Sequence, residues 1–335
     1  MDIQRILVAW FRYSVNGGIN RFIQIANVLQ PQGYEVGFVS LNNKTKTEWP
    51  DFPGKIMTLE ETRQGSWDAV MVPGEGCEEE ECHLFQHLID PRFGIRVQHI
   101  LCDPTLYDKV KRVNSALNPD IVIANNNHWQ EKDFSGLRGG AFHTLPGAVN
   151  TDRFTPGRPD RAADTKEVWS LGGIAPKNLE PLLDAVDVLP KNYRLCLFGK
   201  VPGNLKWRVW KGRLQGRIVS YGPIFGQDLV NFYRRIDIMV TTETQAGWFN
   251  PAAEASAMGV PCIATRHGTI DFLKHMENAL ILEDIAGKAI AENVLQLTSD
   301  PALRVRLAKN ALVTIAQFSY TSYCKELISI LQNFS

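Results

Sequence analysis

The stretch that constrains the fold most runs from Thr241 to Gly268 and reads TTETQAGWFNPAAEASAMGVPCIATRHG. It begins at the end of an apolar run typical of a buried strand, and its pattern predicts a loop, a short helix and another strand. We expect Asn250 to cap the helix, Glu254 to lie in its first turn and Gly259 to end it. The apolar run after Gly259 then enters as a buried strand of a parallel sheet.

The start of this helix suits an anionic ligand. The backbone N–H groups of residues 248–252 would point out of the helix start, except that Pro251 has none. A carboxylate at Glu254 could accept hydrogen bonds from ribose hydroxyls while the amides hold phosphate. This division of roles fits a nucleotide. A carboxylate that serves only the helix dipole remains an alternative for Glu254.

The spacing GxxxxxxEAxAxGxPxxAT, from Gly247 to Thr265, resembles the donor-binding segment of retaining GT-B glycosyltransferases of family 4, which use nucleotide-activated sugars. The resemblance implies that Glu254 is the second carboxylate of the family's E-x7-E pair and holds the donor ribose. The first carboxylate of that pair is absent, because its position is Ala246. The nearest polar substitutes are Gln245 and Glu243.

Composition favours a two-domain protein without a basic surface. The chain has 335 residues, a length typical of two domains. Lys plus Arg and Asp plus Glu both number 36, so no global positive field gathers nucleic acid. The six cysteines show no C-x-x-C spacing, which favours reduced thiols. No signal peptide or membrane-spanning stretch is apparent, so we expect a cytoplasmic protein and leave open a place at the inner face of the membrane.

A second turn that could bind an anion follows the first predicted strand. Residues 3–10 predict a buried strand, and Gly17 and Gly18 precede apolar residues at helical spacing. Two small residues let the backbone approach phosphate or sugar, although an ordinary tight turn remains an alternative. The run GGINRFIQIANVLQPQGYEVGFVS resembles the N-terminal turn of the same family. That resemblance implies that Arg21 takes the family's basic position.

Polar residues also follow two later strands. The run VQHILCD places His99 and Asp103 near the carboxyl edge of the sheet, where α/β proteins bind ligands. In the resembled family a His near this strand end contacts the donor sugar, so His99 is the candidate. Asp103 and a structural histidine packed beneath a loop remain alternatives. The residues 125–128, NNNH, either line the space between the domains or form a turn.

The stretch from Leu145 to Gly157, LPGAVNTDRFTPG, is the clearest linker, and it resembles the family's PNGVDxxxFxP junction between domains. After it, LGGIAPKN predicts a strand-to-turn element. The family places an Arg and a Lys there on the diphosphate, and the matching residues are Gly173 and Lys177. Lys200, Arg266 or Arg21 could replace the missing Arg, and a solvated surface lysine remains an alternative for Lys177.

Three further stretches have possible roles in binding a base, a metal or an acceptor. The family's loop at Tyr221 to Phe225 lies beside the nucleotide base. A zinc site can be imagined at Cys77, Cys82, His83 and His87, but acidic residues at a helix start explain that region better. The run KWRVWKGRLQGR, residues 206–217, could touch a phospholipid-linked or polyanionic acceptor. A solvated helix face with tryptophan stems packed beneath it is the interpretation we prefer.

The alternation of strands and helices predicts an α/β protein with two doubly wound Rossmann-like domains that face a cleft, the GT-B fold of the resembled family. We expect residues 1–150 to form the acceptor-binding domain and residues 151–318 the nucleotide-sugar-binding domain. Residues 319–335 resemble the family's terminal helix, which returns to the N-terminal domain.

The resemblance implies a retaining, metal-independent glycosyltransferase that moves a sugar from a nucleoside diphosphate sugar to a glycan or lipid-linked acceptor, in surface polysaccharide or glycoconjugate synthesis. The sequence has no Asp-x-Asp motif, and we expect no metal, no cofactor and no nucleic acid partner. The expected catalytic residues are His99, Lys177 and Glu254. Donor contacts are expected from Gly17, Gly18, Arg21, Gly173, Lys177, Lys200, Tyr221, Gly247, Trp248, Phe249, Asn250 and Glu254.

Two other functions stay open. The first is a catalytically degenerate GT-B protein that binds a sugar nucleotide or glycan without turnover, because Ala246 and Gly173 depart from the family pattern. The second is an epimerase or phosphorylase on the same fold, since fold alone does not fix chemistry. A peripheral membrane contact is also left open.

Overall fold

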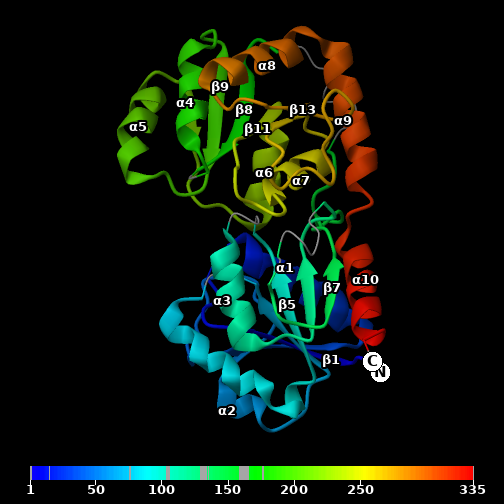
Figure 1. The fold of residues 1–335 in the computed structure, drawn as a ribbon. Helices are drawn as coiled ribbons and strands as arrows, with labels where there is room; N and C mark the ends of the chain where they lie inside the picture. Colours follow the sequence, from blue (N-terminus) through cyan, green and yellow to red (C-terminus); the bar gives the residue numbers. More distant parts are fainter. Residues whose placement is uncertain are drawn as a thin grey trace. The chain divides into compact units, whose positions relative to one another are not determined.

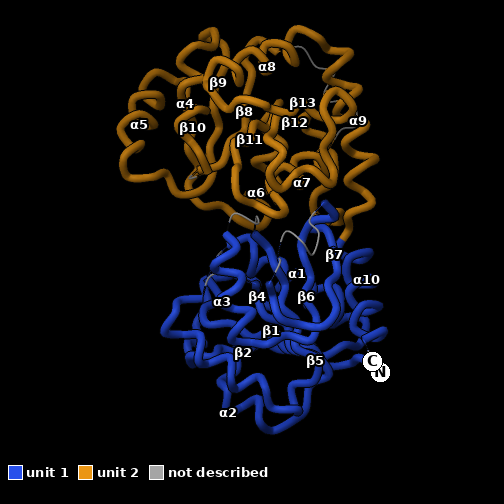
Figure 2. Tube along the Cα trace, in the orientation of Figure 1, with its two compact units in different colours: residues 1–148, 320–335 blue, residues 149–319 orange. Residues whose placement is uncertain are grey.

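The computed structural model describes residues 2–14, 16–74, 77–102, 106–128, 134, 136–157, 166–175 and 177–334. The chain divides into two compact units (Figure 2). Unit 1 comprises residues 1–148 and 320–335, and unit 2 comprises residues 149–319. Within the described residues, no helix has the length and apolar character needed to cross a bilayer.

Unit 1 is built on a seven-stranded sheet in the order β3-β2-β1-β4-β5-β6-β7. Each strand is parallel to its neighbours. The order reverses at β1 and β4, which makes their carboxyl ends a topological switch point. The strands are β1 (Arg5–Trp10), β2 (Glu35–Ser40), β3 (Ile56–Met57), β4 (Ala69–Pro73), β5 (Ile95–Ile100), β6 (Ile121–Ala124) and β7 (Ala141–Thr144).

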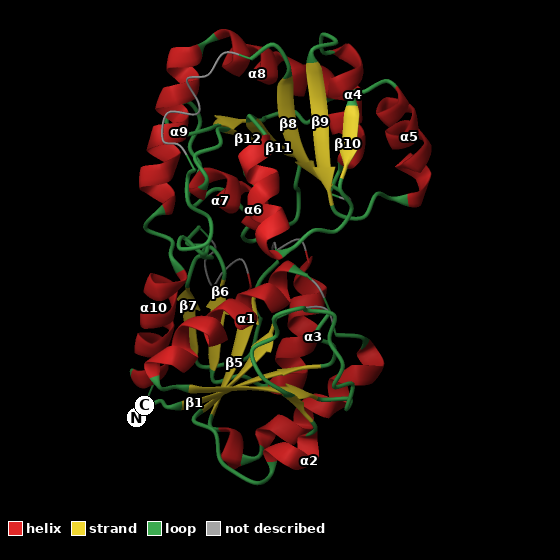
Figure 3. Cartoon of the chain, turned by 180° about the vertical axis from the view of Figure 1, so that it is seen from behind, coloured by secondary structure: helices red, strands yellow, loops and turns green. Residues whose placement is uncertain are grey.

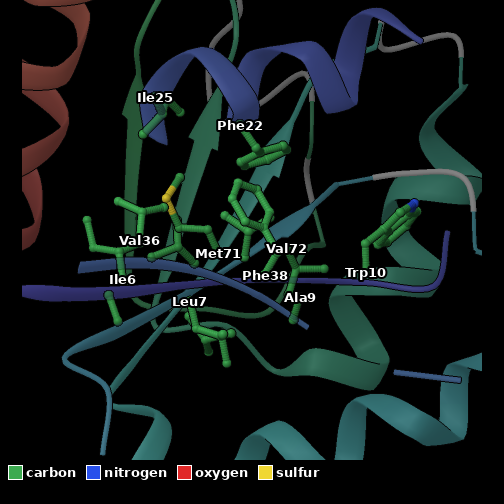
Figure 4. Close-up of a cluster of buried hydrophobic side chains, with 14 of the residues drawn as sticks. Ile6, Leu7, Ala9, Trp10, Phe22, Ile25, Val36, Phe38, Met71 and Val72 are labelled. Carbon is green, nitrogen blue, oxygen red and sulfur yellow. The ribbon is translucent and has the colours of Figure 1, made fainter. Parts of the chain in front are cut away.

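Helices cover the sheet of unit 1 because its central strands are apolar on both faces. Figure 4 shows Phe22 and Ile25 of the first helix over Phe38 and Met71 of the sheet. The last helix of the chain packs against the first helix within this unit. The helices are α1 (Gly17–Leu29), α2 (Leu59–Thr62), α3 (Tyr107–Leu117) and α10 (Tyr320–Gln332), and the 3₁₀ segments are η1 (Gln30–Gln32), η2 (Glu79–Ile89) and η3 (Pro91–Phe93).

Unit 2 is built on a six-stranded parallel sheet in the order β10-β9-β8-β11-β12-β13. Here the order reverses at β8 and β11. Figures 1 and 3 show the strands enclosed by helices. The strands are β8 (Trp169–Ile174), β9 (Tyr193–Phe198), β10 (Ile218–Ser220), β11 (Ile238–Thr241), β12 (Cys262–Ala264) and β13 (Leu280–Ile281).

The helices of unit 2 are α4 (Leu179–Val188), α5 (Lys206–Leu214), α6 (Gly226–Arg235), α7 (Asn250–Ala257), α8 (Gly287–Ser299) and α9 (Pro301–Ile315), and η7 (Gly203–Leu205) precedes α5. The expected packing of tryptophans beneath α5 is wrong. Val209 and Gly212 are the residues that face inward, and Trp207 and Trp210 are exposed.

The structure confirms the predicted fold class, with two doubly wound parallel sheets and a terminal helix on unit 1. The predicted start of α7 is wrong in detail. Phe249, not Asn250, is the N-cap, and no side chain caps the helix. Asn250 is already the first residue of the helix, and Phe249 before it has no side-chain oxygen that could accept from the free amides. Glu254 consequently lies beyond the first turn.

A substitution at Gly199 tests how closely the loops at the strand ends of unit 2 approach one another. Its φ is +92°, and a Cβ there would lie 2.0 Å from the carbonyl oxygen of Ala175. We expect Gly199→Ala to lower the free energy of unfolding by about 2 kcal/mol or more, and the thermal midpoint of this unit by about 4–8 °C. Gly203→Ala is the matched control, because a Cβ at Gly203 meets no atom within 4 Å. Equal midpoints for the two variants would contradict this account.

Candidate functional site

The loops at the carboxyl edge of the unit 2 sheet are joined by hydrogen bonds across the switch point. Thr242, after β11, donates from Oγ1 to the carbonyls of Lys177 and Asn178, each at 3.0 Å. Asn178 returns a bond from Nδ2 to the Thr242 carbonyl over 2.8 Å. The Gly199 N–H, after β9, donates to the Gly222 carbonyl, after β10. These loops therefore lie where open α/β sheets bind ligands.

Lys177 and Glu243 meet at this edge. The Nζ of Lys177 lies 2.8 Å from Oε2 of Glu243. The other carboxylate oxygen, Oε1, accepts from the backbone N–H groups of Thr244 and Gln245 at 2.9 Å each. The contact with Lys177 lacks hydrogen-bond geometry, so Oε2 keeps acceptor capacity. The sequence motif placed Ala246 at the position of the first carboxylate, but the structure brings the carboxylate of Glu243 to Lys177.

Glu254 is a buried carboxyl on α7, with 8% of its surface exposed. The hydroxyl of Tyr233, on α6, donates to its Oε2 over 2.7 Å. Burial raises the pKa of Glu254 to about 7, against smaller opposing effects of the Tyr233 hydrogen bond and the charge of Arg153. Burial thus favours the protonated form, and this carboxyl titrates near neutral pH. Extra donors from a ligand would favour its charged form.

The residues before α7 are more enclosed than the sequence indicated. The side chains of Trp248 and Phe249 are buried, and Gly247 is buried with them. The Trp248 ring lies 4.6 Å from that of Phe272 and 5.3 Å from that of Phe318, centroid to centroid. Because the Phe249 amide already donates to Gly268, it is not free for a ligand. Asn250 is half-buried at the first position of the helix.

Gly173, Lys200 and Tyr221 lie in different surroundings. Gly173 is buried within β8, and a Cβ there would lie 3.1 Å from the side chains of Leu182 and Leu197. The position that the motif assigned to a diphosphate-binding Arg therefore faces the core. Lys200 is exposed directly after Gly199. The half-buried Tyr221 has its ring 5.7 Å from that of Phe232.

Arg266, named as a substitute for the missing Arg, is already paired. Its Nη2 lies 2.9 Å from Oε1 of Glu283. Lys177 is therefore the cation that the described loops bring to the β8–β11 switch point with a specific partner.

In unit 1, Gly17 and Gly18 begin α1 beside a pocket of about 310 Å³. Asn16 caps the helix, since its Oδ1 accepts from the Ile19 N–H over 2.8 Å. The pocket lies at the carboxyl ends of β1 and β4, the switch point of this sheet. Its lining includes Trp10, Phe11, Arg12, Asn16, Gly18, Glu78 and Glu81. Sequence reasoning did not identify Arg12, Glu78 or Glu81 as residues that line a pocket.

Arg21 and His99 lie inside unit 1, away from solvent. Arg21 donates from Nη1 to Oδ1 of Asn125 over 2.6 Å, and its guanidinium lies 5.2 Å from the centre of the Tyr323 ring. His99 Nε2 contacts the Tyr323 hydroxyl at 2.5 Å. Burial, aided by the charge of Arg21, holds the pKa of His99 well below its usual value. This setting favours the alternative of a structural histidine, while Asp103 lies outside the described residues.

The imagined zinc site gains no support. The sulfur atoms of Cys77 and Cys82 lie 2.8 Å apart, but His83 Nδ1 contacts the Glu80 carbonyl instead of joining them. Within the part of the chain that the structure describes, no three His, Cys, Asp or Glu side chains are grouped to hold a metal.

Comparisons with known proteins agree with this architecture. Residues 165–300 match the family model of glycosyl transferases group 1. The chain is 33% identical to sucrose-phosphate synthase 1 of Arabidopsis thaliana over 82 residues, which are 24% of this chain and 8% of that protein. It is 28% identical to the lipopolysaccharide core biosynthesis glycosyltransferase LpsE of Rhizobium meliloti over 176 residues, or 51% of each chain. The matched parts thus span about half or less of these relatives.

Among solved structures, HepE of Anabaena in complex with UDP and glucose has a similar fold. The TM-score is 0.75 at 13% identity, over 98% of this chain and 100% of that one. At this identity the likeness concerns the fold. Residues 165–300 therefore match the group 1 glycosyl transferase model, within a chain whose two switch-point sheets and returning helix α10 have a fold similar to that of HepE.

Proposed function

We propose that this protein transfers a sugar, with retention and without a metal ion, from a nucleoside diphosphate sugar to a glycan or lipid-linked acceptor. One observation carries the proposal. Within the group 1 domain, Lys177 and Glu243 meet at the carboxyl ends of β8 and β11, and α7, with Glu254, begins after the same β11 loop. A cation and two buried carboxyls suit a ligand that carries both phosphate and hydroxyl groups.

Lys177 is the group we assign to the diphosphate. Its ammonium is exposed and reaches the site from the turn after β8, where the Thr242 hydroxyl binds the carbonyls of Lys177 and Asn178. A positive charge placed there stabilises the negative charge that grows on the departing diphosphate. Glu243 orients the ammonium before the donor arrives and retains its two backbone amide contacts afterwards.

Glu254 is assigned to the donor ribose. Ribose hydroxyls would supply hydrogen bonds that a buried carboxylate needs, in addition to the one from Tyr233. Because such donors stabilise the charged form, nucleotide binding should displace the proton that burial favours. Affinity for the nucleotide should therefore rise with pH through 7.

The pocket of unit 1 is assigned to the acceptor. Its volume of about 310 Å³ is at the small end of the range for small-molecule sites. Trp10 and Phe11 offer apolar faces, and Arg12, Glu78 and Glu81 offer polar groups of both signs. Such a mixture suits a sugar ring, which has apolar faces and a hydroxyl rim. The relatives whose names point to lipopolysaccharide and sucrose phosphate act on sugars, which supports a glycan acceptor for this chain.

A nucleotide panel tests the proposal. Thermal unfolding is followed with UDP, GDP, ADP, CDP and dTDP, each with and without its common sugars. A ligand at a hundred times its Kd adds about 2.7 kcal/mol of stability, which raises the midpoint by several degrees. The sugar donors that contain the nucleotide which raised the midpoint are then used in transfer assays in the presence of a chelator. NMR of the product gives its anomeric configuration. Binding without turnover would point to the degenerate protein, and no shift at all would contradict the proposed donor site.

The pKa of Glu254 predicts how stability varies with pH. The folded-state pKa of about 7 is above the ordinary value of 4.5, so this carboxyl contributes stability that is lost as pH rises through 7. Wild type should lose about 2–3 kcal/mol of unfolding free energy from this carboxyl between pH 5 and pH 8. Glu254→Gln should not show that loss, so its stability relative to wild type should rise by the same amount. Urea unfolding at both pH values measures the change. Glu283→Gln, at an exposed carboxylate, should show no such gain.

Nucleotide affinity of the Glu254→Gln variant distinguishes a role in binding the ribose from a purely structural role beside Tyr233. Glu254→Gln should bind the nucleotide diphosphate at least about tenfold more weakly at pH 8, because a neutral amide accepts more weakly than a carboxylate. Equal Kd values for wild type and Glu254→Gln, by calorimetry, would leave Glu254 with its hydrogen bond to Tyr233 alone.

Lys177→Ala should weaken binding of the nucleoside diphosphate more than that of the monophosphate. Loss of a charged hydrogen bond costs about 1.5–3 kcal/mol, or roughly a factor of 10–150 in Kd. Calorimetric titration with both nucleotides gives the ratio. Lys288→Ala, at an exposed lysine on α8, is the matched control. An equal loss with the two nucleotides would sink the diphosphate assignment.

Glu243→Gln tests whether this residue replaces the missing first carboxylate. The amide oxygen can still accept from Thr244 and Gln245, so the loop should keep its conformation. If the carboxylate also holds the donor sugar, the variant should lose more affinity for the nucleotide sugar than for the nucleoside diphosphate, by about tenfold. The same affinity ratio as in wild type would restrict Glu243 to orienting Lys177.

A further inference from the structure

Helix α5 carries an apolar stripe that faces water. Trp207 is 62% exposed, Trp210 63% and Leu214 69%. Their spacing of three and seven residues places them on one side of the helix. Val209 and Gly212 are buried on the other side. Two exposed tryptophans and a leucine on nine helical residues are unusual for a surface whose only contact is water.

The stripe cannot turn inward without unpacking the helix. A Cβ at Gly212 would lie 2.4 Å from the Cδ1 of Ile218, so α5 lies directly on β10 at this point. Arg208 fixes the adjoining side, because its Nη2 lies 2.8 Å from both Asp184 and Asp187 of α4. Figure 1 shows α5 beside α4 at the rim of its sheet. The tryptophans are therefore held outward by the fold of unit 2 itself.

Positive charges border the stripe on both sides. At 100° per residue, Lys206 and Arg213 lie along one border and Lys211 along the other. Among the residues that the structure describes, none of these three forms an ion pair. Asp184 and Asp187 of α4 are bound by Arg208, which lies on the side of α5 away from the tryptophans. The chain as a whole has no net charge, so this positive field is local.

Charge and chemistry together select one occupant. Two copies docked through this stripe would bring the same three cations into close contact, which opposes self-association. An anionic bilayer offers an apolar layer for the indoles and leucine, and phosphates for the cations. Lys and Arg stems can also cover apolar surface while their charges reach the headgroups. The short helix would lie in the plane of the interface rather than cross it.

We propose that α5 docks unit 2 on an anionic lipid bilayer, with Trp207, Trp210 and Leu214 in the headgroup region and Lys206, Lys211 and Arg213 on lipid phosphates. This inference stands independently of the donor and acceptor of the reaction. It assigns to the nucleotide-sugar unit a surface that the proposed sugar transfer does not use.

Co-sedimentation of the full chain with vesicles tests the proposal. One set is phosphatidylcholine and the other contains about a third phosphatidylglycerol, at low and at high salt. Each Lys or Arg near an anionic surface adds about fivefold to partitioning, so three should give roughly a hundredfold preference for the anionic vesicles at low salt. High salt should remove most of that preference. Tryptophan emission should shift to the blue on binding.

Two variants and one control separate the two parts of the surface. W207A/W210A should lose partitioning by at least roughly tenfold with its charges intact. K206Q/K211Q/R213Q should bind anionic and neutral vesicles alike. The control L295A/V313A removes exposed apolar side chains from α8 and α9 and should bind as wild type. Thermal midpoints equal to that of wild type show that the folded state is preserved, since all these side chains are exposed.

The opposing results are equally definite. Wild type that stays in the supernatant with anionic vesicles at low salt would overturn the proposal. Unchanged binding by W207A/W210A would overturn it as well. If wild type is a dimer by analytical ultracentrifugation and W207A/W210A is a monomer, the stripe is an interface between copies and not a membrane surface.

Discussion

The hydrogen bonds between the turn after β8 and the loop after β11 are the constraint on which the candidate donor site depends. These two strands are neighbours only because the sheet order reverses there, so their loops come from segments more than sixty residues apart in the sequence. Thr242 binds the carbonyls of Lys177 and Asn178, and the next residue, Glu243, then meets the Lys177 ammonium. The hydrogen bonds of Thr242 thus fix the two loops in the position that lets the Lys177 ammonium contact the Glu243 carboxylate. The side chains that would touch a ligand are oriented by bonds that involve no ligand.

Burial sets the chemistry of the acidic residues in unit 2. One oxygen of Glu243 accepts from two backbone amides, and the other lies 2.8 Å from the Lys177 ammonium without hydrogen-bond geometry. Glu254 accepts a hydrogen bond from the Tyr233 hydroxyl over 2.7 Å. Burial outweighs this hydrogen bond and the charge of Arg153, and raises the pKa of Glu254 to about 7. Perturbation of this kind is typical of functional sites, although structural networks also produce it.

The sequence predicted the sheets well because buried parallel strands are continuous apolar runs, and glycines mark the turns between them. It also named Glu254, Lys177 and Glu243. It could not pair Lys177 with Glu243, since periodicity says nothing about contacts across a switch point. The start of α7 was missed by one residue, because Asn250 already belongs to the helix and the residue before it, Phe249, has no side chain that can cap. In α5, apolar residues lie on two sides of the helix, and only the tertiary fold shows that Val209, not the tryptophans, meets the sheet. His99 and Arg21 were chosen from their resemblance to the family's binding residues. In the structure both contact Tyr323 on α10, which lies over two hundred residues away in the sequence.

The return of α10 to unit 1 has a consequence for the order of synthesis. Unit 1 contains residues from both sides of unit 2 in the chain, so a ribosome makes all of unit 2 before the last helix of unit 1. Until α10 emerges, the face of α1 that it covers is open, and His99 lacks the Tyr323 hydroxyl. Unit 2 is a continuous segment and can complete its core first. The unit whose residues come first in the chain is therefore the one that finishes folding last, and a nascent chain would expose its apolar helix face for the longest time.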